Sequence, residues 1–276
     1  MGDNLKLPSG RADLHIHSTW SDGSLSIARI VKTAKALGLA AISVTDHDTM
    51  AGQEEAGEEG KKQGLEIIPG IEVSAFDPET GRKVHILGYR IADQGTVETA
   101  CRPYLTDRHR ANRGALSLIR AAGYCVDEED VSAYIGKGGV LYRQHIMHAL
   151  ADRGYTTAIY GPLYRWFFGP GGIAVAQSRY MPAEEAVRLI VDCGGKAVLA
   201  HPFQYDSLGL LPKLAGWGLG GIECWHHTQT SGRERQVQEG AERYGLFLTG
   251  GSDFHGLYSE KPIPLGFNKN EQPPRA

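Results

Sequence analysis

Short apolar runs alternate with amphipathic stretches over the first 90 residues, and this alternation predicts strands and helices in turn. The segment ADLHI, residues 12–16, is typical of a strand. Residues 26–38 carry apolar side chains at helical spacing and end on a glycine, which predicts an amphipathic helix. Further strands are expected at residues 39–45, 65–76 and 82–89, and a solvent-facing helix at 52–63. The pattern indicates an α/β fold built from βαβ units.

The pattern changes in the middle of the chain. Residues 96–181 are rich in Arg and Ala at helical spacing, with Tyr, Trp and Gly between the helical pieces, and we predict an inserted helical subdomain there. The α/β alternation resumes at Pro182, so residues 11–95 and 182–266 are expected to form one domain. Residues 267–276 are expected to form a flexible tail.

Residues of the kind that bind metals lie at or near the ends of the predicted strands. Asp13, His15 and His17 occupy alternate positions, so they would share one face of the first strand. Other candidates are expected at the ends of later strands, with His85 alone expected within a strand. The second strand would end on Asp46, His47 and Asp48, the third on Glu72, and the last two of the set on His201 and on Asp253 with His255. Parallel α/β barrels build their sites at the carboxyl ends of several strands. One such histidine is more often a capped or exposed side chain, but the whole set predicts a centre for Zn, Mn or Fe.

Composition narrows the possible partners. A chain of 276 residues can form one large α/β domain with an insertion. Its net charge of −3 gives no general attraction to nucleic acid or anionic lipid, so a phosphate would be bound locally. Without an apolar leader or a run of membrane length, the protein is expected to be cytoplasmic, with no membrane and no obligate protein partner. The four cysteines form no CxxC pair and are expected to be reduced thiols.

Five segments carry a resemblance to a known family. They are, in order, DLHIHSTWSDG, VTDHDT, GIEVS, AHPF and GGSDFHG. They resemble the motifs of the PHP (polymerase and histidinol phosphatase) family of metal-dependent phosphoesterases. The segment between them resembles the helical insertion of the stand-alone bacterial branch that hydrolyses nucleotide phosphates. The resemblance implies a distorted (β/α)7 barrel with an inserted small helical subdomain and two or three divalent metal ions, Mn, Fe or Zn.

Carried over position by position, the resemblance also implies a set of ligands. The first ion would be bound by His15, His17 and Asp253, and Glu72 would bridge it to a second ion completed by His85 and His201. A third ion would be bound by Asp22, His47 and His255. Asp22 stands where several members have histidine, so the third site would differ in affinity or metal preference. Asp13 is expected to orient a ligand imidazole without touching metal.

The implied chemistry is phosphoester hydrolysis, because clustered divalent ions activate water and neutralise phosphate oxygens. We expect a phosphate monoester of a nucleotide, such as a nucleoside 3',5'-bisphosphate, to be attacked by a metal-bound hydroxide. Arg143 and His145 resemble the family's substrate-contacting segment, although Gln144 stands where the family usually has proline. From the residues alone, a surface salt bridge is an equal alternative for Arg143. His227 is expected to contact substrate or give a proton to the leaving group.

Three other functions are compatible with the sequence. A 5'-to-3' exoribonuclease acting on short RNA would need a basic groove with stacking aromatics. The insertion offers candidates for it: Arg102, Arg108, Arg110, Arg113 and Arg120, with Tyr104, Tyr124 and Tyr134. Histidinol phosphate is a different possible substrate. A non-catalytic metal-binding scaffold is the alternative outside enzymes.

Overall fold

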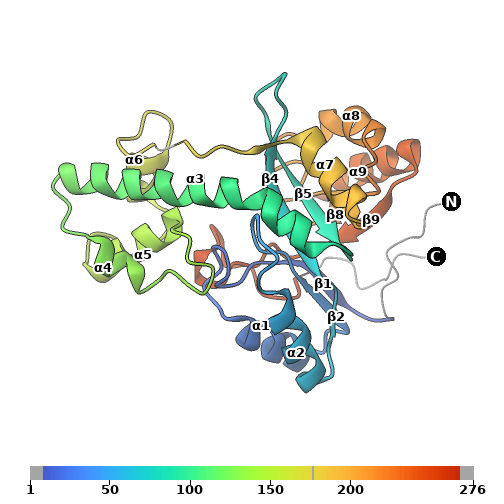
Figure 1. The fold of residues 1–276 in the computed structure, drawn as a ribbon, viewed down its shortest axis with the longest axis horizontal. Coiled ribbons are helices and arrows are strands. Elements are labelled where there is room, and N and C mark those ends of the chain that lie inside the picture. The colour runs from blue at the N-terminus through green and yellow to red at the C-terminus, as the bar shows by residue number, and fades with distance from the viewer. Residues whose placement is uncertain (1–8, 176, 268–276) are drawn as a thin grey trace.

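The computed structural model describes residues 9–175 and 177–267, shown in Figure 1. Its strands form two sheets with the orders β1-β2-β3 and β6-β4-β5-β7-β8-β9. The strands are β1 (Ala12–Ile16), β2 (Ala41–Val44), β3 (Glu66–Ile67), β4 (Gly70–Phe76), β5 (Lys83–Tyr89), β6 (Met181–Pro182), β7 (Lys196–Leu199), β8 (Gly221–Trp225) and β9 (Phe247–Gly250). The helices are α1 (Ile27–Ala36), α2 (Gln53–Gln63), α3 (Gln94–Ala121), α4 (Glu128–Ser132), α5 (Arg143–Asp152), α6 (Pro162–Phe168), α7 (Ala183–Asp192), α8 (Leu211–Gly216) and α9 (Ser231–Tyr244).

The larger sheet is mixed. Strand β5 pairs antiparallel with both β4 and β7, whereas the pairs β4–β6, β7–β8 and β8–β9 are parallel. The smaller sheet is parallel throughout. Two single bridges, Ile16 with Phe254 and His47 with Glu72, connect the two sheets. The predicted α/β class is confirmed, with mixed rather than uniformly parallel pairing, and the closed barrel stays a prediction.

Residues 65–76 form two strands where the sequence predicted one. Strand β3 pairs with β2, and β4 pairs with β5, so the chain leaves one sheet and enters the other between Ile67 and Gly70. Pro69 lies at this change and has no N–H to give to a sheet, which fits the interruption.

Helix α1 shows how the local sequence fixes an element. The Ser26 side chain accepts a hydrogen bond from the Arg29 N–H and caps the helix, and Gly38 follows its last turn with a φ of 74°. The apolar face predicted from spacing is buried, with Ile30 and Val31 both at 0% exposure. Helices α1 and α2 pack together beside β1 and β2 (Figure 1).

The long helix α3 spans two hydrophobic cores. Its first half contributes Val97 and Cys101 to the core of the larger sheet. Its second half contributes Leu116 and Ile119 to a separate core that also contains residues of α5 and α6. In Figure 1, α3 extends away from the strands and carries α4, α5 and α6 near its far end. The helical nature of this segment is as expected, while the boundaries 96–181 stay a prediction.

The sequence predicted a flexible tail at residues 267–276 and no segment that crosses a membrane. Of the predicted tail, residues 268–276 lie outside the described residues. Within the described ranges, no helix has both the length and the apolar character that crossing a bilayer requires.

Candidate metal centre

Strand β1 and the residue that follows it place two histidines side by side. His15 and His17 are both 0% exposed, as the alternation predicted for one face of a buried strand. The end of β9 lies directly against them, because Gly251 packs on the Cβ atom and backbone of His15, where a side chain would have no room. Gly251 therefore allows the loop carrying Asp253 to approach β1 closely.

Glu72 lies at the middle of the cluster. Its Oε1 atom is 2.8 Å from both His85 Nδ1 and His201 Nε2. Its Oε2 atom is 3.1 Å from His47 Nδ1, 3.2 Å from His17 Nε2 and 3.3 Å from His15 Nε2. A carboxylate surrounded by imidazoles in this way has both oxygens available to neighbouring cations.

Glu72 and His85 lie within their strands, and this corrects the expectation that Glu72 ends its strand. Glu72 is the third residue of β4, and His85 is the third residue of β5. Because β5 runs antiparallel to β4 and places His85 opposite Ser74, an early residue of β5 reaches the same region as the ends of the parallel strands. In Figure 1 the β4 and β5 hairpin extends beyond the neighbouring strands.

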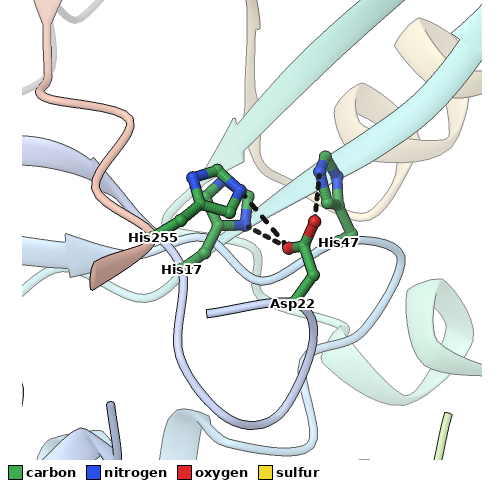
Figure 2. Close-up of side chains that lie close together, drawn as sticks. All are labelled: His17, Asp22, His47 and His255. Atoms are coloured by element: carbon green, nitrogen blue, oxygen red, sulfur yellow. Dashed lines mark ion pairs between the residues drawn. The ribbon is translucent and has the colours of Figure 1, made fainter. Parts of the chain in front are cut away.

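The structure gathers all nine predicted metal ligands in one region. Three groups have ligand atoms within 4.8 Å of one another: His15, His17, Glu72 and Asp253; His47, Glu72 and His85; His17, Asp22, His47 and His255. His201 joins them through its contact with Glu72. Figure 2 shows the last group, in which the three imidazoles surround the Asp22 carboxylate. The assignment of each residue to a particular ion stays a prediction.

The donor set fits divalent cations. His15 Nε2 and both ring nitrogens of His17 are buried and have no hydrogen-bond partner among the described residues. Asp253 Oδ1 lies 3.4 Å from His15 Nε2 and 3.3 Å from His17 Nε2. Buried nitrogens without a hydrogen bond are costly, and a cation between them and the carboxylates would remove that cost.

Electrostatics within the cluster favours ionised carboxylates. Burial raises the pKa of Glu72, but the imidazoles of His85, His15 and His47 outweigh it and hold that pKa well below its ordinary value. Burial likewise opposes ionisation of Asp253, whose pKa is held well below its ordinary value by His15, His255 and other imidazoles. Ionised carboxylates are the form that binds metal.

Backbone strain coincides with this region. Asp48, His201 and Asp253 have positive φ angles of 58°, 22° and 53°. Such values are uncommon for residues with side chains and are concentrated at functional sites. Asp48 is not a member of the three groups. Its carboxylate accepts a hydrogen bond from the Ser74 N–H and forms an ion pair with Arg108, each at 2.7 Å.

A buried glutamate that the sequence analysis did not single out orients one of the ligands. Glu223 on β8 is 0% exposed, with Oε1 3.1 Å from His15 Nδ1, and its Oε2 accepts the backbone N–H of His201 at 2.8 Å. A carboxylate at Nδ1 leaves Nε2 of His15 as the ligand atom. A charged residue inside the apolar strand GIECW was the available signal.

Asp13 has a different role from the one expected. Its carboxylate accepts hydrogen bonds from Ser252 N, Ser252 Oγ and Gly266 N at 2.9, 2.6 and 2.8 Å. It therefore fixes the loop that precedes Asp253, and the contact with a ligand imidazole comes from Glu223.

Replacing Glu223 with glutamine is expected to weaken metal binding by about 10–100-fold, the usual cost of losing a residue that orients a ligand. The two carboxylate oxygens of Glu223 accept from His15 Nδ1 and from the His201 N–H. Glutamine has one carbonyl oxygen and one NH₂ group, so it can keep only one of these two contacts. Titration of metal-free protein with Mn²⁺ measures the effect, with the exposed Glu239→Gln as control. Equal affinities in the two variants would contradict the role of Glu223.

Replacing Asp13 with alanine is expected to lower the free energy of unfolding by roughly 3 kcal/mol, because buried donors lose a charged acceptor. Urea unfolding in the presence of a chelator separates this effect from metal binding. The exposed Asp192→Ala on α7 serves as control. A loss no greater than that of the control would show that Asp13 does not fix the loop.

A cavity of about 660 Å³ opens above the cluster. Its floor includes Asp22, His47, Glu72, His85, His201, Asp253 and His255, and its wall carries the cations Lys83, Arg108, Arg143, Arg165 and Lys261. Several tyrosines complete the wall: Tyr142, Tyr160, Tyr164, Tyr180, Tyr205 and Tyr258. Cavities of this volume accommodate small organic ligands, and both charged and aromatic side chains line this one.

The three predicted substrate-contacting residues differ in position. Arg143 and His227 line the cavity. His145 is 1% exposed, its Nδ1 accepts the Tyr142 N–H, and it is not among the described residues that line the cavity. Burial lowers the pKa of His145 to about 4. The roles of all three residues in substrate binding stay predictions.

Arg108 is a second residue whose place the sequence did not reveal. Its guanidinium donates to Asp48 Oδ2 at 2.7 Å and to Ser74 Oγ at 2.8 Å, and lies 5.3 Å and 5.9 Å from the ring centres of Tyr142 and Tyr180. It thus ties α3 to the strands that carry the cluster. Two other arginines of the expected basic groove pair with nearby carboxylates, Arg110 with Asp107 and Arg113 with Glu128.

Comparisons with known proteins agree with this site. The model of the PHP domain matches residues 13–132. A phosphoribosyl 1,2-cyclic phosphate 1,2-diphosphodiesterase from Eggerthella lenta is 43% identical over 91% of this chain and 96% of its own length. A 5'-3' exoribonuclease from Haemophilus influenzae is 30% identical (88% and 89% covered), and a 3',5'-nucleoside bisphosphate phosphatase from Chromobacterium violaceum is 29% identical (88% and 86%).

A solved structure shares the fold. A Bifidobacterium adolescentis protein assigned as a metal-dependent phosphoesterase superposes with a TM-score of 0.83 at 26% identity, covering 95% of this chain and 93% of that one. The chain belongs to the PHP domain family. It is a phosphoric ester hydrolase with buried His, Asp and Glu clusters suited to several metal ions.

Proposed function

We propose that this enzyme hydrolyses a phosphoester of a ribose compound that carries a second phosphate. The observation that carries the proposal is the cavity, in which metal-ligand residues form the floor and five cationic side chains line the wall. One phosphate would lie on the floor, and the second would be met by the wall cations. The similarity to the Eggerthella lenta diesterase makes a ribose 1,2-cyclic phosphate bearing a 5-phosphate the first candidate substrate.

The proposal includes the ligand assignment and the fold implied by the family resemblance. A neutral imidazole carries one lone pair, so His17 can serve only one ion. Its Nε2 faces two carboxylates, Glu72 and Asp253, which supports its assignment to the first ion. The bridges that join the two sheets support a distorted barrel. The helical segment from residue 96 to residue 181 is proposed as the subdomain that closes the cavity.

The bound ions and the two arginines of the cavity would have different roles. Bound divalent ions would supply activated water and neutralise phosphate oxygens. Arg143, the first residue of α5, would bind the phosphate that does not react. Arg108 would mainly hold the insertion in place, since Asp48 already pairs with it.

His227 would serve the leaving oxygen. Burial and the neighbouring His226 lower the pKa of His227 to about 4. Its Nδ1 lies 3.2 Å from the Ser252 carbonyl, so the neutral ring carries its proton there and leaves Nε2 as an acceptor. A phosphate dianion bound beside the ring raises the pKa, and Nε2 would then hold the proton that the leaving oxygen needs.

A panel of substrates tests the proposed function in the presence of Mn²⁺. It comprises ribose 1,2-cyclic phosphate 5-phosphate, adenosine 3',5'-bisphosphate, AMP, 3'-AMP, histidinol phosphate and a short 5'-phosphorylated RNA. Phosphorus NMR follows the cyclic ester, whose ring opening releases no phosphate, and a phosphate-release assay follows the monoesters. We expect the largest kcat/KM for the cyclic ester and the next for the bisphosphate.

Other results would reject the proposal in distinct ways. Equal turnover of AMP and the bisphosphate would show that the second phosphate is not recognised. Preference for RNA would favour the function named for the Haemophilus influenzae relative. No turnover of any phosphoester by metal-loaded protein would favour the non-catalytic scaffold.

A further inference from the structure

The side chain of Gln144 reaches from the insertion to the metal cluster. Gln144 is the second residue of α5, and its Nε2 donates to Asp22 Oδ2 at 3.0 Å, across 122 residues of sequence. The Asp22 carboxylate is an acceptor, so the amide must present its NH₂ group to it. Gln144 also lines the cavity, together with Tyr160.

The two oxygens of Asp22 therefore have different surroundings. Oδ1 lies 3.3 Å from His255 Nε2 and 3.7 Å from His17 Nδ1. Oδ2 receives the Gln144 amide and is farther, 3.9 Å, from His47 Nε2. Ser21 Oγ approaches Oδ1 at 3.4 Å, but its shorter contact, 2.6 Å, is with Asp46. Oδ1, which has only the long Ser21 contact, is thus the oxygen better placed for a cation beside His255, while His47 lies on the Oδ2 side (Figure 2).

Asp22 is the single carboxylate of its group. Within the described residues, Asp22 belongs to this group alone, whereas Glu72 is shared by the other two groups, one of which also contains Asp253. The affinity of a site for a divalent cation rises with the number and the correct orientation of its charged ligands. A small rotation of Asp22 would therefore matter most for a cation held here.

We propose that Gln144 is a positioning residue for a third metal ion: it occupies one oxygen of Asp22, presents the other to the ion, and so sets the affinity of that site. The inference rests on the proposed function only in assuming that this group binds a cation. It adds that the helical insertion, through α5, contributes to metal binding as well as to the wall of the cavity.

The test is a calorimetric titration of the metal-free full-length protein with Mn²⁺, which needs no substrate. We expect three ions in the wild type, the third binding most weakly. The variant Gln144→Met keeps the length of the side chain but has no amide, and we expect it to weaken the third ion by about 10–100-fold while the first two change little. Retention of those two ions also shows that the variant is folded.

A matched control and a second variant complete the design. Gln204 lines the same cavity, and Gln204→Met makes the same chemical change away from Asp22, so all three affinities should be kept. Gln144→Asn keeps an amide but withdraws its nitrogen by one methylene, and we expect it to reproduce the loss seen with methionine. A loss in Gln144→Asn would show that the hydrogen bond to Asp22 matters, and not merely a polar side chain at this position. This test does not depend on whether Gln144→Met folds.

The possible failures are distinguishable. An unchanged third affinity in both Gln144 variants would overturn the inference, as would a wild type that binds only two ions while it hydrolyses phosphoesters. Three ions with a selective Gln144 effect, but no phosphoester turnover, would support the inference and reject the proposed function.

Discussion

Replacing His17 with alanine is expected to lower kcat/KM by more than about 100-fold, because even residues that only orient a ligand contribute about 10–100-fold. His17 Nε2 faces Glu72 and Asp253 at 3.2 and 3.3 Å, and the ring is fully buried. Without the imidazole, the ion would lose the nitrogen ligand that lies beside Glu72 and Asp253. Metal content should therefore fall together with activity. Elemental analysis and steady-state kinetics on the same preparation measure both.

A second histidine provides the control for this experiment. His109 lies on α3, and its Nδ1 accepts the Leu141 N–H, a contact that glutamine can replace. His109→Gln should keep its metal and its activity. Treatment of the wild type with a chelator should reproduce the loss seen in His17→Ala, and added Mn²⁺ should restore the wild type alone. Normal turnover by His17→Ala at unchanged metal content would remove His17 from the ligand set.

The expected result for Arg143→Ala is a loss of about 10–100-fold in kcat/KM with full metal content, since a hydrogen bond to a charged group contributes about 1.5–3 kcal/mol. The guanidinium lies at the cavity wall, stacked over the Phe168 ring at 5.1 Å, and stands at the start of α5, where helix geometry also favours anions. Arg143→Lys should recover only part of the loss, because an ammonium cannot bind a phosphate through two parallel hydrogen bonds.

The loss should depend on the substrate. If Arg143 binds the phosphate that does not react, its removal should matter much less for a monophosphate such as AMP than for the bisphosphate. Arg188 on α7, paired with Glu184 at the surface, provides a control arginine whose replacement should change neither substrate. The same fold-loss on AMP and on the bisphosphate would place Arg143 elsewhere in the reaction, and no loss on either would return it to a surface salt bridge.

Much of the site followed from local sequence. The alternate spacing of His15 and His17 predicted that they share one face, and in the structure their ring centres lie 5.2 Å apart with both side chains fully buried. The identity of the ligand-type residues was also readable, because imidazoles and carboxylates seldom accompany buried strands without a reason. The resemblance of five short segments to one family then predicted that these residues meet, and all nine candidates do.

Other features were beyond local patterns. The antiparallel course of β5 explains how His85 reaches the cluster, yet periodicity does not distinguish parallel from antiparallel strands. Glu223 and His15 are separated by 208 residues, and Arg108 and Asp48 by 60, so no spacing rule connects either pair. The change of sheet at Pro69 likewise depends on which strands are available as partners.

By itself, the sequence determined the periodicity of its helices and strands, the kinds of metal ligands available and the family to which they point. Only the tertiary structure decided which oxygen of Asp22 faces Gln144, which carboxylate orients His15 and which cations surround the cavity. The physical reason is that periodicity is set by backbone geometry within a few residues, whereas ligand orientation is set by hydrogen bonds between segments that only packing brings together.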